Sequence, residues 1–538
     1  MIQYQTTSTI LSWMVFVPII GTVCILAAIS IRYLFQFDKK FVDNASRLIS
    51  LISTFIVFLL SLKIWALFET GVNTIQIVHR FVWIESFNVE YFLGIDGINI
   101  AMVILTALIT LVACIASLPW WGKVDSNHFS KVMTPGYMIL LLILETGMLG
   151  TFCALDFFLF FFFWEIMLLP MYFLIGIWGG PGKEYAAIKF FLYTLVGSVL
   201  MLLAMIAIYY ASEPFVLANG KLADHTFNLV ALANMGQSGL FANANSILGF
   251  PFAKAVWIAL FIGFAIKIPM FPFHTWLPDA HVEAPTPVSV ILAGILLKTG
   301  GYGILRFNFQ LFPWATGWAA FAIAVFGMIN IVYAAYVCMA QTDLKKLIAY
   351  SSVSHMGFVL LGYAAFTPQG ISGAMFQMVA HGLISPMLFL IAGVIYDRAH
   401  IREIEGFGGL ATKMPEYTGI VGLAFMASLG LPGLAGFIGE ILVFLGAFPV
   451  YTALTIISAT AVVITAAYHL WAIQRMFLGQ FNEKWAELWD INWRERLTLY
   501  PLGAIVILFG FYPVPVFHLI NGSLHPLITM IKAAGGIP

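Results

Sequence analysis

Apolar residues fill most of the chain in long, unbroken runs that are separated by short polar stretches. A helix that crosses a membrane needs about 20 mostly apolar residues, and only helices or closed barrels satisfy the backbone in lipid. Continuous runs of this length exclude the alternating pattern of barrel strands, so we expect an all-α polytopic membrane protein. The runs predict fourteen spans, near residues 11–35, 47–68, 97–119, 134–153, 155–177, 187–211, 253–273, 286–306, 316–339, 346–366, 371–396, 416–447, 450–477 and 498–521.

Helix-breaking residues interrupt two of these predicted spans. The seventh contains Pro269 and Pro272, and each proline would leave the carbonyl four residues earlier free, at Ala265 and Ile268. The twelfth is longer than a membrane requires and contains the sequence 431–433, Leu-Pro-Gly. We therefore expect both helices to be broken rather than merely tilted.

The positions of the two breaks suggest an internal repeat. Interrupted helices at corresponding places in two halves of a chain point to a transport site. Spans 4–8 and 9–13 would form two five-helix repeats, and the odd number of helices would invert one repeat relative to the other. The predicted divisions are a three-helix N-terminal segment, a first repeat, a second repeat and a C-terminal connection with the last span and an outer tail, at 1–133, 134–306, 316–477 and 478–538. Incidental kinks in a helical bundle remain the alternative.

Lys and Arg favour the inner side of a membrane, and here they are unevenly divided between the two sets of connections. If both termini face outward, five of the 25 Lys and Arg lie on the outer side: Arg80, Lys221, Lys254, Arg306 and Lys532. Three more fall within spans, namely Lys63, Lys267 and Lys298. The others, Lys123 and Lys131 among them, lie on the inner side, which predicts an even number of spans with both termini outside.

The amino-acid composition supports a membrane protein and excludes soluble and nucleic-acid-binding proteins. Only 9% of the 538 residues are charged, against about 25% in soluble domains, and the mean hydropathy is +0.96. Equal numbers of basic and acidic residues, 25 of each, leave no basic surface for nucleic acid. The four cysteines, Cys24, Cys114, Cys153 and Cys338, lie singly in apolar runs, so we expect buried apolar side chains rather than metal ligands. With no nucleotide-binding loop either, we expect no cofactor in this chain.

Several ionisable side chains lie far from the predicted span ends. Such a group costs upward of about 2.5 kcal/mol at the centre of a bilayer and is a functional candidate by default. A buried lysine releases its proton more readily, and a nearby carboxylate reverses that effect. Movement of the carboxylate in a Glu–Lys pair can therefore make the lysine bind or release a proton. The candidates for proton transfer are Glu145, Glu165, Lys267, Lys298, His355, His381 and Glu440. Static ion pairs and ordinary core histidines are the alternatives, whereas Lys345, Lys346, Arg398 and Arg402 are expected to be ordinary inward-facing charges.

The segments around these candidates resemble a known family. They are residues 267–290, beginning Lys-Ile-Pro-Met-Phe-Pro, and Lys298-Thr-Gly-Gly-Tyr-Gly, Phe162-Phe-Trp-Glu165, Asp343 to His355, and Leu431-Pro-Gly-Leu-Ala-Gly-Phe-Ile-Gly-Glu440. Together they resemble the proton-conducting, antiporter-like membrane subunits of respiratory complex I, over about residues 10–520. The resemblance implies fourteen helices with an inverted five-helix repeat.

The resemblance also implies roles for the candidates. Glu165 and Lys267 would form the tuning pair of the inner half-channel, Lys298 and His355 the central relay with His381 nearby, and Glu440 the terminal group of the outer half. Related chains of other branches usually carry lysine at the position of Glu440. NADH, FMN, iron–sulfur clusters and quinone would be bound by partner subunits, and L-like and N-like membrane chains would lie on either side. The implied location is a bacterial inner membrane.

Two other functions remain open at this point. One is a subunit of a Na⁺/H⁺ antiporter or of a membrane-bound hydrogenase from the same family. The acidic residue at position 440 argues against the antiporter. The other is a structural spacer that carries no protons. A redox enzyme in its own right is disfavoured because the chain offers no set of cofactor ligands.

Overall fold

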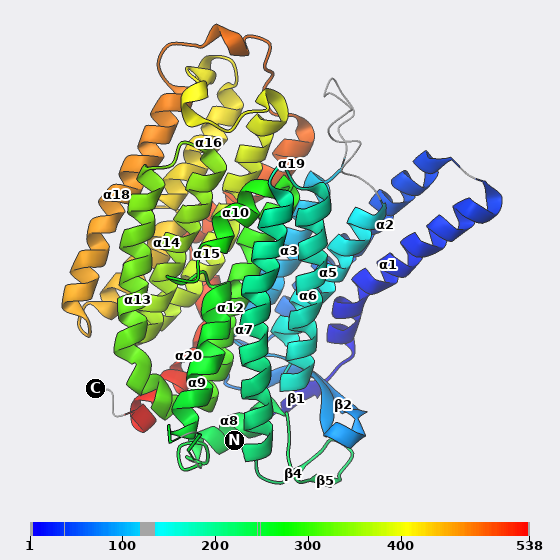
Figure 1. The fold of residues 1–538 in the computed structure, drawn as a ribbon, viewed down its shortest axis with the longest axis vertical. Helices are drawn as coiled ribbons and strands as arrows, with labels where there is room; N and C mark the ends of the chain where they lie inside the picture. Colours follow the sequence, from blue (N-terminus) through cyan, green and yellow to red (C-terminus); the bar gives the residue numbers. More distant parts are fainter. Residues whose placement is uncertain (1–3, 37, 119–134, 245, 248, 536–538) are drawn as a thin grey trace.

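The computed structural model describes residues 4–36, 38–118, 135–244, 246–247 and 249–535. Their long helices run side by side in a bundle, with short strands at the end where the N-terminus lies (Figure 1). We call that end outer, following the predicted orientation. The helices of the N-terminal part and first repeat are α1 (Ile10–Phe35), α2 (Lys39–Leu67), α3 (Ile100–Ala116), α5 (Pro135–Cys153), α6 (Phe157–Trp178), α7 (Lys183–Ala211), α8 (Leu229–Gln237), α9 (Phe252–Lys267) and α10 (Trp276–Glu283).

The next helix is continuous but changes its winding twice. It comprises α11 (Thr286–Ile291), a π-helical turn η2 (Leu292–Leu296), α12 (Leu297–Gly303) and a second π-helical segment η3 (Ile304–Phe309). The remaining helices are α13 (Pro313–Met339), α14 (Leu344–Ala364), α15 (Pro368–Ala399), α16 (Pro415–Ser428), α17 (Ala435–Ala447), α18 (Thr452–Phe477), α19 (Trp493–Phe511) and α20 (Val514–Gly535). Short 3₁₀ turns lie at Glu85–Phe87, Ile404–Gly406, Leu410–Thr412 and Glu483–Trp485.

The all-α membrane prediction is confirmed. In the described part of the chain, 11 helices are long and apolar enough to cross a membrane. Each of the first thirteen predicted spans overlaps one helix or one broken pair, although α3, α9 and α17 are shorter than a full span. The count of fourteen therefore stays a prediction, as do the four divisions of the chain. Lys123 and Lys131, which contribute to the predicted orientation, lie outside the described residues.

Both predicted breaks are present. The first separates α9 from α10 at residues 268–275, and the second separates α16 from α17 at residues 429–434. The seventh span was predicted to end at 273, which is wrong because α10 continues it to Glu283. The polar residues of α10, such as Asp279 and His281, hid this half-helix from an apolar pattern.

The predicted fourteenth span, 498–521, is also wrong, because it joins the end of α19 to the start of a separate helix. Pro513 lies between them, and proline restricts both itself and the residue before it. The second helix, α20, packs against Gly71, Gly97 and Ser372, which all lie at the outer end. It therefore crosses the outer end of the bundle, as Figure 1 shows.

Small strands that the sequence reasoning did not predict cover the outer end. β1 (Tyr4–Thr7) pairs in parallel with β2 (Ile75–Ile84), which pairs in antiparallel with β3 (Val89–Ile95), and β4 (Phe215–Val216) pairs with β5 (Leu222–Ala223). Arg80 on β2 forms a 2.8 Å ion pair with the buried Glu90 on β3. Glu90 also accepts hydrogen bonds from the N–H of Ala218 and the side-chain amide of Asn228, so this sheet is joined to the outer loop of the first repeat.

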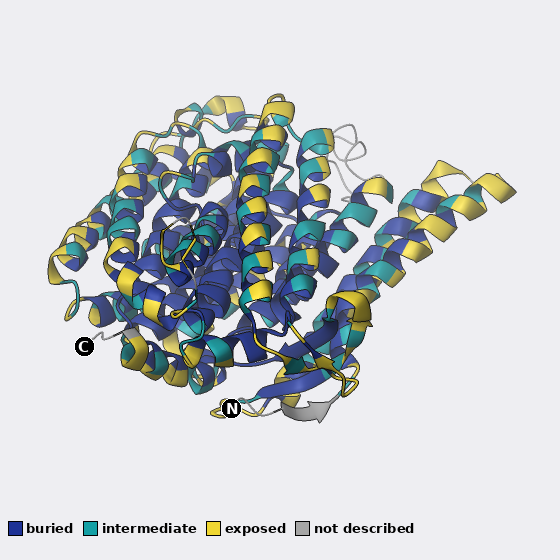
Figure 2. Ribbon diagram, turned by 60° about the horizontal axis from the view of Figure 1, so that its bottom comes forward, coloured by how far each residue is buried: buried dark blue, intermediate teal, exposed yellow. Residues whose placement is uncertain are grey.

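The helices differ in how far the protein itself buries them. The most apolar stretch of α15 is wholly buried and that of α14 is 94% buried, whereas the corresponding values are 39% for α1 and 33% for α2 and α18. Figure 2 shows exposed residues along the α1–α2 hairpin, which projects from the bundle. Cys24 on α1 is accordingly exposed, against the prediction that all four cysteines are buried, because α1 turns one side away from the other helices. The central helices are the ones that carry Lys298, His355 and His381.

Candidate functional site

Lys298 and His381 are in direct contact at the centre of the bundle. Lys298 on α12 is completely buried, and its Nζ lies 2.7 Å from Nδ1 of His381 on α15. The same Nζ donates a hydrogen bond to the carbonyl of Ala293, which lies in the π-helical turn η2. Such turns occur mostly as local insertions in α-helices, frequently at functional sites. Here the altered winding places a carbonyl within reach of the lysine.

His355 and Glu440 form the second contact of the site. Nδ1 of His355 on α14 lies 3.0 Å from Oε1 of Glu440 on α17, and both side chains are buried. Nε2 of His355 lies 3.2 Å from the hydroxyl of Ser428, the last residue of α16. The histidine thus lies between the two halves of the second broken helix.

A small cavity joins these two contacts. The His355 and His381 rings are 5.6 Å apart, centre to centre, and both line a cavity of about 10 Å³ together with Glu440, Gln377 and Ser385. That volume is about what one water molecule needs. Nε2 of His381 and Oε1 of Gln377 have no hydrogen-bond partner among the described residues, so a water here would have polar groups to bind. Lys298, His381, His355 and Glu440 therefore form one row, which we call the central row.

The second break shapes the position of Glu440. Gly430 and Gly433 have φ angles of +82° and +92°, a conformation that favours glycine. A Cβ atom at Gly430 would lie 2.9 Å from Oε2 of Glu440, so the carboxylate packs directly on this turn. The prediction of a glycine- and proline-broken helix thus identifies the element that holds the buried acid.

The first break holds Lys267 differently. Lys267 is the last residue of α9, is 2% exposed, and has its Nζ 5.3 Å from the ring centres of both Trp164 and Phe190. Glu165 is the acidic group whose charge acts on it, yet no ion pair within 4.0 Å joins the two in the described residues. Oε1 of Glu165 is buried without a hydrogen-bond partner there. The expected tuning pair is therefore close but not in contact.

Hydrogen bonds from other helices stabilise the first break. Asn330 on α13 accepts from the N–H of Phe271 at 2.7 Å and donates to the carbonyl of Pro269 at 3.2 Å. The indole of Trp276 donates to the carbonyl of Ile266. The carbonyl of Ala265, which was predicted to be free, accepts the N–H of Met270 at 2.9 Å. That prediction was wrong because the chain bends so that the next N–H along replaces the missing one.

Glu145 lies apart from the central row. It is completely buried on α5, and neither of its carboxylate oxygens has a hydrogen-bond partner among the described residues. Cys114 on α3 is a neighbour whose charge interacts with it. The structure therefore isolates this candidate instead of joining it to Glu165 or Lys298.

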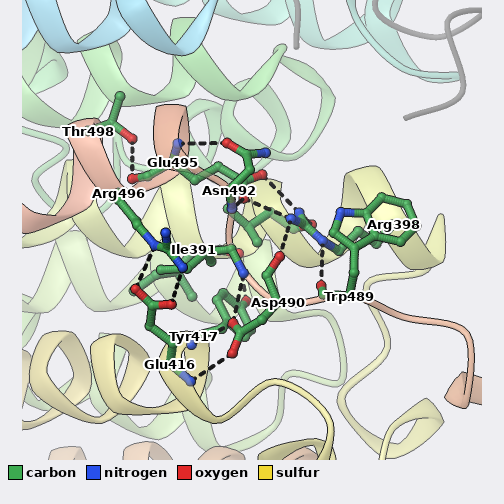
Figure 3. Close-up of polar contacts among 12 residues, drawn as sticks. Ile391, Arg398, Glu416, Tyr417, Trp489, Asp490, Asn492, Glu495, Arg496 and Thr498 are labelled. Atoms are coloured by element: carbon green, nitrogen blue, oxygen red, sulfur yellow. Dashed lines mark hydrogen bonds and ion pairs between the residues drawn. The ribbon is translucent and has the colours of Figure 1, made fainter. Parts of the chain in front are cut away.

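Two of the residues that were expected to be ordinary inward-facing charges, Lys345 and Arg398, are buried in the protein. Lys345 is 3% exposed, and the Arg398 side chain is 2% exposed and forms a 2.7 Å ion pair with Glu495 on α19. Figure 3 shows Arg398 and Glu495 within a network that also includes Glu416, Asp490 and Arg496. The partners lie about 100 residues apart in sequence, so a local pattern gave no signal for these contacts. Among the described residues, no group of three or more His, Cys, Asp or Glu is placed to hold a metal ion.

Comparison with known proteins gives consistent matches. The family model described as NADH:quinone oxidoreductase/Mrp antiporter, TM, matches residues 154–465. NADH-quinone oxidoreductase subunit M of Rickettsia prowazekii (strain Madrid E) is 41% identical over 515 residues, covering 95% of this chain and 99% of the relative. F(420)H(2) dehydrogenase subunit M of Methanosarcina mazei is 36% identical, with coverage of 88% and 92%. A chain in the structure of respiratory complex I from Thermus thermophilus with bound NADH superposes with a TM-score of 0.81 at 26% identity, covering 97% of this chain and 99% of that one.

Proposed function

The chain belongs to the NADH:quinone oxidoreductase/Mrp antiporter transmembrane family, and on that premise we propose that it is an M-type subunit that moves protons across the membrane. The observation that carries the proposal is the central row: Lys298, His381, His355 and Glu440 are buried and successively adjacent. Buried ion pairs are weak stabilisers, so a row of this kind is costly for a merely structural role.

The row offers a direct physical route for a proton. Lys298 can pass a proton to Nδ1 of His381 over 2.7 Å, and His355 can exchange one with Glu440 over 3.0 Å. The gap between the two imidazoles is lined by the small cavity, where one water would bridge the remaining distance. Histidine is suited to this role because each ring nitrogen can either bind or release a proton near neutral pH.

Lys267 and Glu165 serve as the switch of the inner half in this proposal. Their charges interact without a contact ion pair, so a small movement of either side chain changes how strongly Lys267 holds its proton. Glu145 is assigned a proton-transfer role on the same grounds of complete burial, at a place separate from the row.

The proposed setting is a respiratory complex in a bacterial inner membrane, with both termini on the outer face. Electron transfer occurs in other subunits, which bind NADH, FMN, iron–sulfur clusters and quinone. L-like and N-like membrane chains lie on either side of this one. The two five-helix segments, 134–306 and 316–477, act as inverted half-channels, each with its break in the fourth helix.

A second candidate is a subunit of a different complex of the same family. The relative from Methanosarcina mazei is named as part of an F(420)H(2) dehydrogenase, so the electron donor can differ between close relatives. The Mrp branch would give cation/proton antiport instead. The higher identity and coverage of the NADH-quinone oxidoreductase relative favour the first proposal.

The test is NADH-driven proton uptake by inverted membrane vesicles that carry Lys298→Ala in the whole complex. We expect assembled complex on a native gel and loss of proton uptake, because the row loses its first member. The matched control is Lys63→Ala, since Lys63 is a lysine within a membrane helix, α2, but is exposed on the bundle surface. Normal uptake in both variants would refute the proposal and favour a non-conducting spacer.

A further inference from the structure

Arg306 is buried at the outer end of the helix that carries Lys298. It lies in the π-helical segment η3 and is 3% exposed, although its place at the end of a predicted span put it among the outer charges. Its guanidinium donates two hydrogen bonds to Asp96, from Nη1 to Oδ2 at 2.7 Å and from Nη2 to Oδ1 at 2.8 Å. We propose that Arg306 and Asp96 are positioning residues, which fix the winding of this helix and so keep Lys298 within the central row. The inference rests on the proposed function.

Asp96 is itself held rigidly at the start of α3. Its backbone N–H donates to the side-chain oxygen of Asn99 at 2.9 Å, and its carboxylate accepts the N–H of Ile98 at 3.0 Å. The side-chain amide of Asn99 donates in turn to the carbonyls of Gly94 and Phe152, at 2.9 Å each. Asp96 therefore presents a fixed carboxylate, which the planar fork of an arginine matches better than the point charge of a lysine would.

Tyr302 makes a second connection between Arg306 and the surrounding helices. It is completely buried, accepts a hydrogen bond from Nε of Arg306 at 3.0 Å and donates one to the carbonyl of Phe152 at 3.1 Å. Phe152 is the next-to-last residue of α5, so these contacts join the helix that carries Lys298 to both α3 and α5. Tyr302 follows Lys298 by four residues, so both side chains leave the same face of α12.

The winding of α12 is only weakly determined by its own sequence. Its seven residues lie between the π-helical segments η2 and η3, and three of the seven are Gly300, Gly301 and Gly303. Glycine is a poor helix former, because it loses more conformational freedom than other residues when it is ordered. A residue gained or lost in the winding turns the adjoining segment by about 100°. A turn of that size would carry Lys298 away from His381.

The contacts of Lys298 itself change during proton transfer and cannot hold α12 in place. Its Nζ touches the carbonyl of Ala293 and Nδ1 of His381, and both contacts alter when the lysine gives up its proton. Arg306 does not release its proton at accessible pH, so its pair with Asp96 persists through every transfer. The pair therefore gives the helix a fixed point that is independent of the protonation of the row.

The alternative is an ion pair that only stabilises the fold. Replacing both members of a buried pair by apolar residues of similar volume is often neutral or stabilising, whereas removing one member is destabilising. The double variant Asp96→Leu/Arg306→Met therefore removes the fork and the carboxylate while keeping the site packed. It separates the position of Lys298 from the stability of the protein.

The test measures NADH-driven proton uptake and NADH oxidation in parallel, in inverted vesicles that carry the whole complex, with assembly followed on a native gel. The variants are Arg306→Met, the double variant and the milder Asp96→Asn. Arg80→Met is the matched control, because Arg80 forms a 2.8 Å pair with the buried Glu90 at the same outer end but lies outside the central row.

We expect Arg306→Met and the double variant to lower proton uptake per assembled complex by about 10²-fold, the effect that a displacement of about 1 Å can have on a transfer step. Asp96→Asn should lower it less, and Arg80→Met should lower thermal stability without this loss. Normal uptake in the assembled double variant would overturn the inference, and so would an equal loss in Arg80→Met.

Cryo-electron microscopy of the double variant gives an independent measurement. We expect Nζ of Lys298 to lie beyond hydrogen-bond distance of His381, and an unchanged contact would overturn the inference. If Lys298→Ala stops uptake while the double variant pumps normally, only the positioning role fails. If Lys298→Ala pumps normally, the proposed function itself fails.

Discussion

The two broken helices each carry a buried charge, but they hold it in different ways. At the first break, Lys267 faces the rings of Trp164 and Phe190 at 5.3 Å and has no contact ion pair in the described residues. At the second, Glu440 lies 3.0 Å from His355. Nδ1 of His355 and Oε1 of Glu440 are therefore within contact distance, although neither of these two atoms makes a hydrogen bond among the described residues, whereas no ion pair within 4.0 Å joins Lys267 to Glu165 there.

The two breaks also differ in how their backbone is stabilised. Asn330 and Trp276, which come from outside the turn, satisfy the peptide groups of the first break. The second turn relies on Gly430 and Gly433 in the left-handed region instead. The comparison suggests that the first half works as a switch and the second half as a preassembled conductor.

The largest effect is expected from removing the acid of the second half. Glu440→Gln keeps the shape of the side chain but cannot exchange a proton, so transfer through this chain should fall on the order of 10²-fold or more. NADH-driven proton uptake in vesicles is the measurement, and Glu487→Gln, an exposed site in the inner loop, is the control. Unchanged uptake in Glu440→Gln would show that the His355–Glu440 contact is structural.

A smaller effect on proton uptake is expected from alanine at Gly430 or Gly433. Comparing the two variants separates the effect on the position of Glu440 from the effect of backbone strain. Alanine at either Gly430 or Gly433 forces a left-handed residue, at a cost of about 1–2 kcal/mol. Only at Gly430 does the new Cβ approach the Glu440 carboxylate, because at Gly433 its nearest neighbour is the Phe511 ring at 3.3 Å. Both variants should lower thermal stability in detergent, and only Gly430→Ala should also reduce proton uptake. Equal uptake in the two variants would contradict the assigned position of Glu440.

The smallest effect on transport is expected at the first break. Asn330→Leu removes the hydrogen bonds to Phe271 and Pro269 and should destabilise the protein by about 1–3 kcal/mol. Thermal unfolding of the solubilised complex measures this loss, and Ser30→Ala, at an exposed position on α1, is the control that should lose little. No difference between the two variants would mean that Asn330 does not support the break.

The sequence predicted the features that depend on composition and local order. Apolar runs located the spans, Pro269 and the Leu431-Pro-Gly sequence located the breaks, and position within a span identified the buried charges. It could not predict which charges touch, since Lys298 and His381 are 83 residues apart and meet only through packing of α12 on α15. Nor could it predict whether Glu165 and Lys267 touch: no ion pair within 4.0 Å joins them in the described residues, and their role as a tuning pair stays a prediction.

Elements with mixed polarity were the other source of error. α10 was missed because its charged residues conceal a half-helix, and α20 was merged with α19 because an apolar run continues across Pro513. Arg398 and Lys345, both buried, were expected to be ordinary inward-facing charges, since their positions at span ends are typical of flanking residues.

The most direct test of the account is Lys267→Arg, with NADH oxidation and proton uptake followed in parallel in inverted vesicles. Arginine keeps the positive charge over the aromatic rings but does not release its proton at accessible pH. With assembly shown on a native gel, the account predicts loss of proton uptake, because the first half would no longer switch. Normal uptake at normal turnover would contradict it, since a fixed charge at this position would then be sufficient.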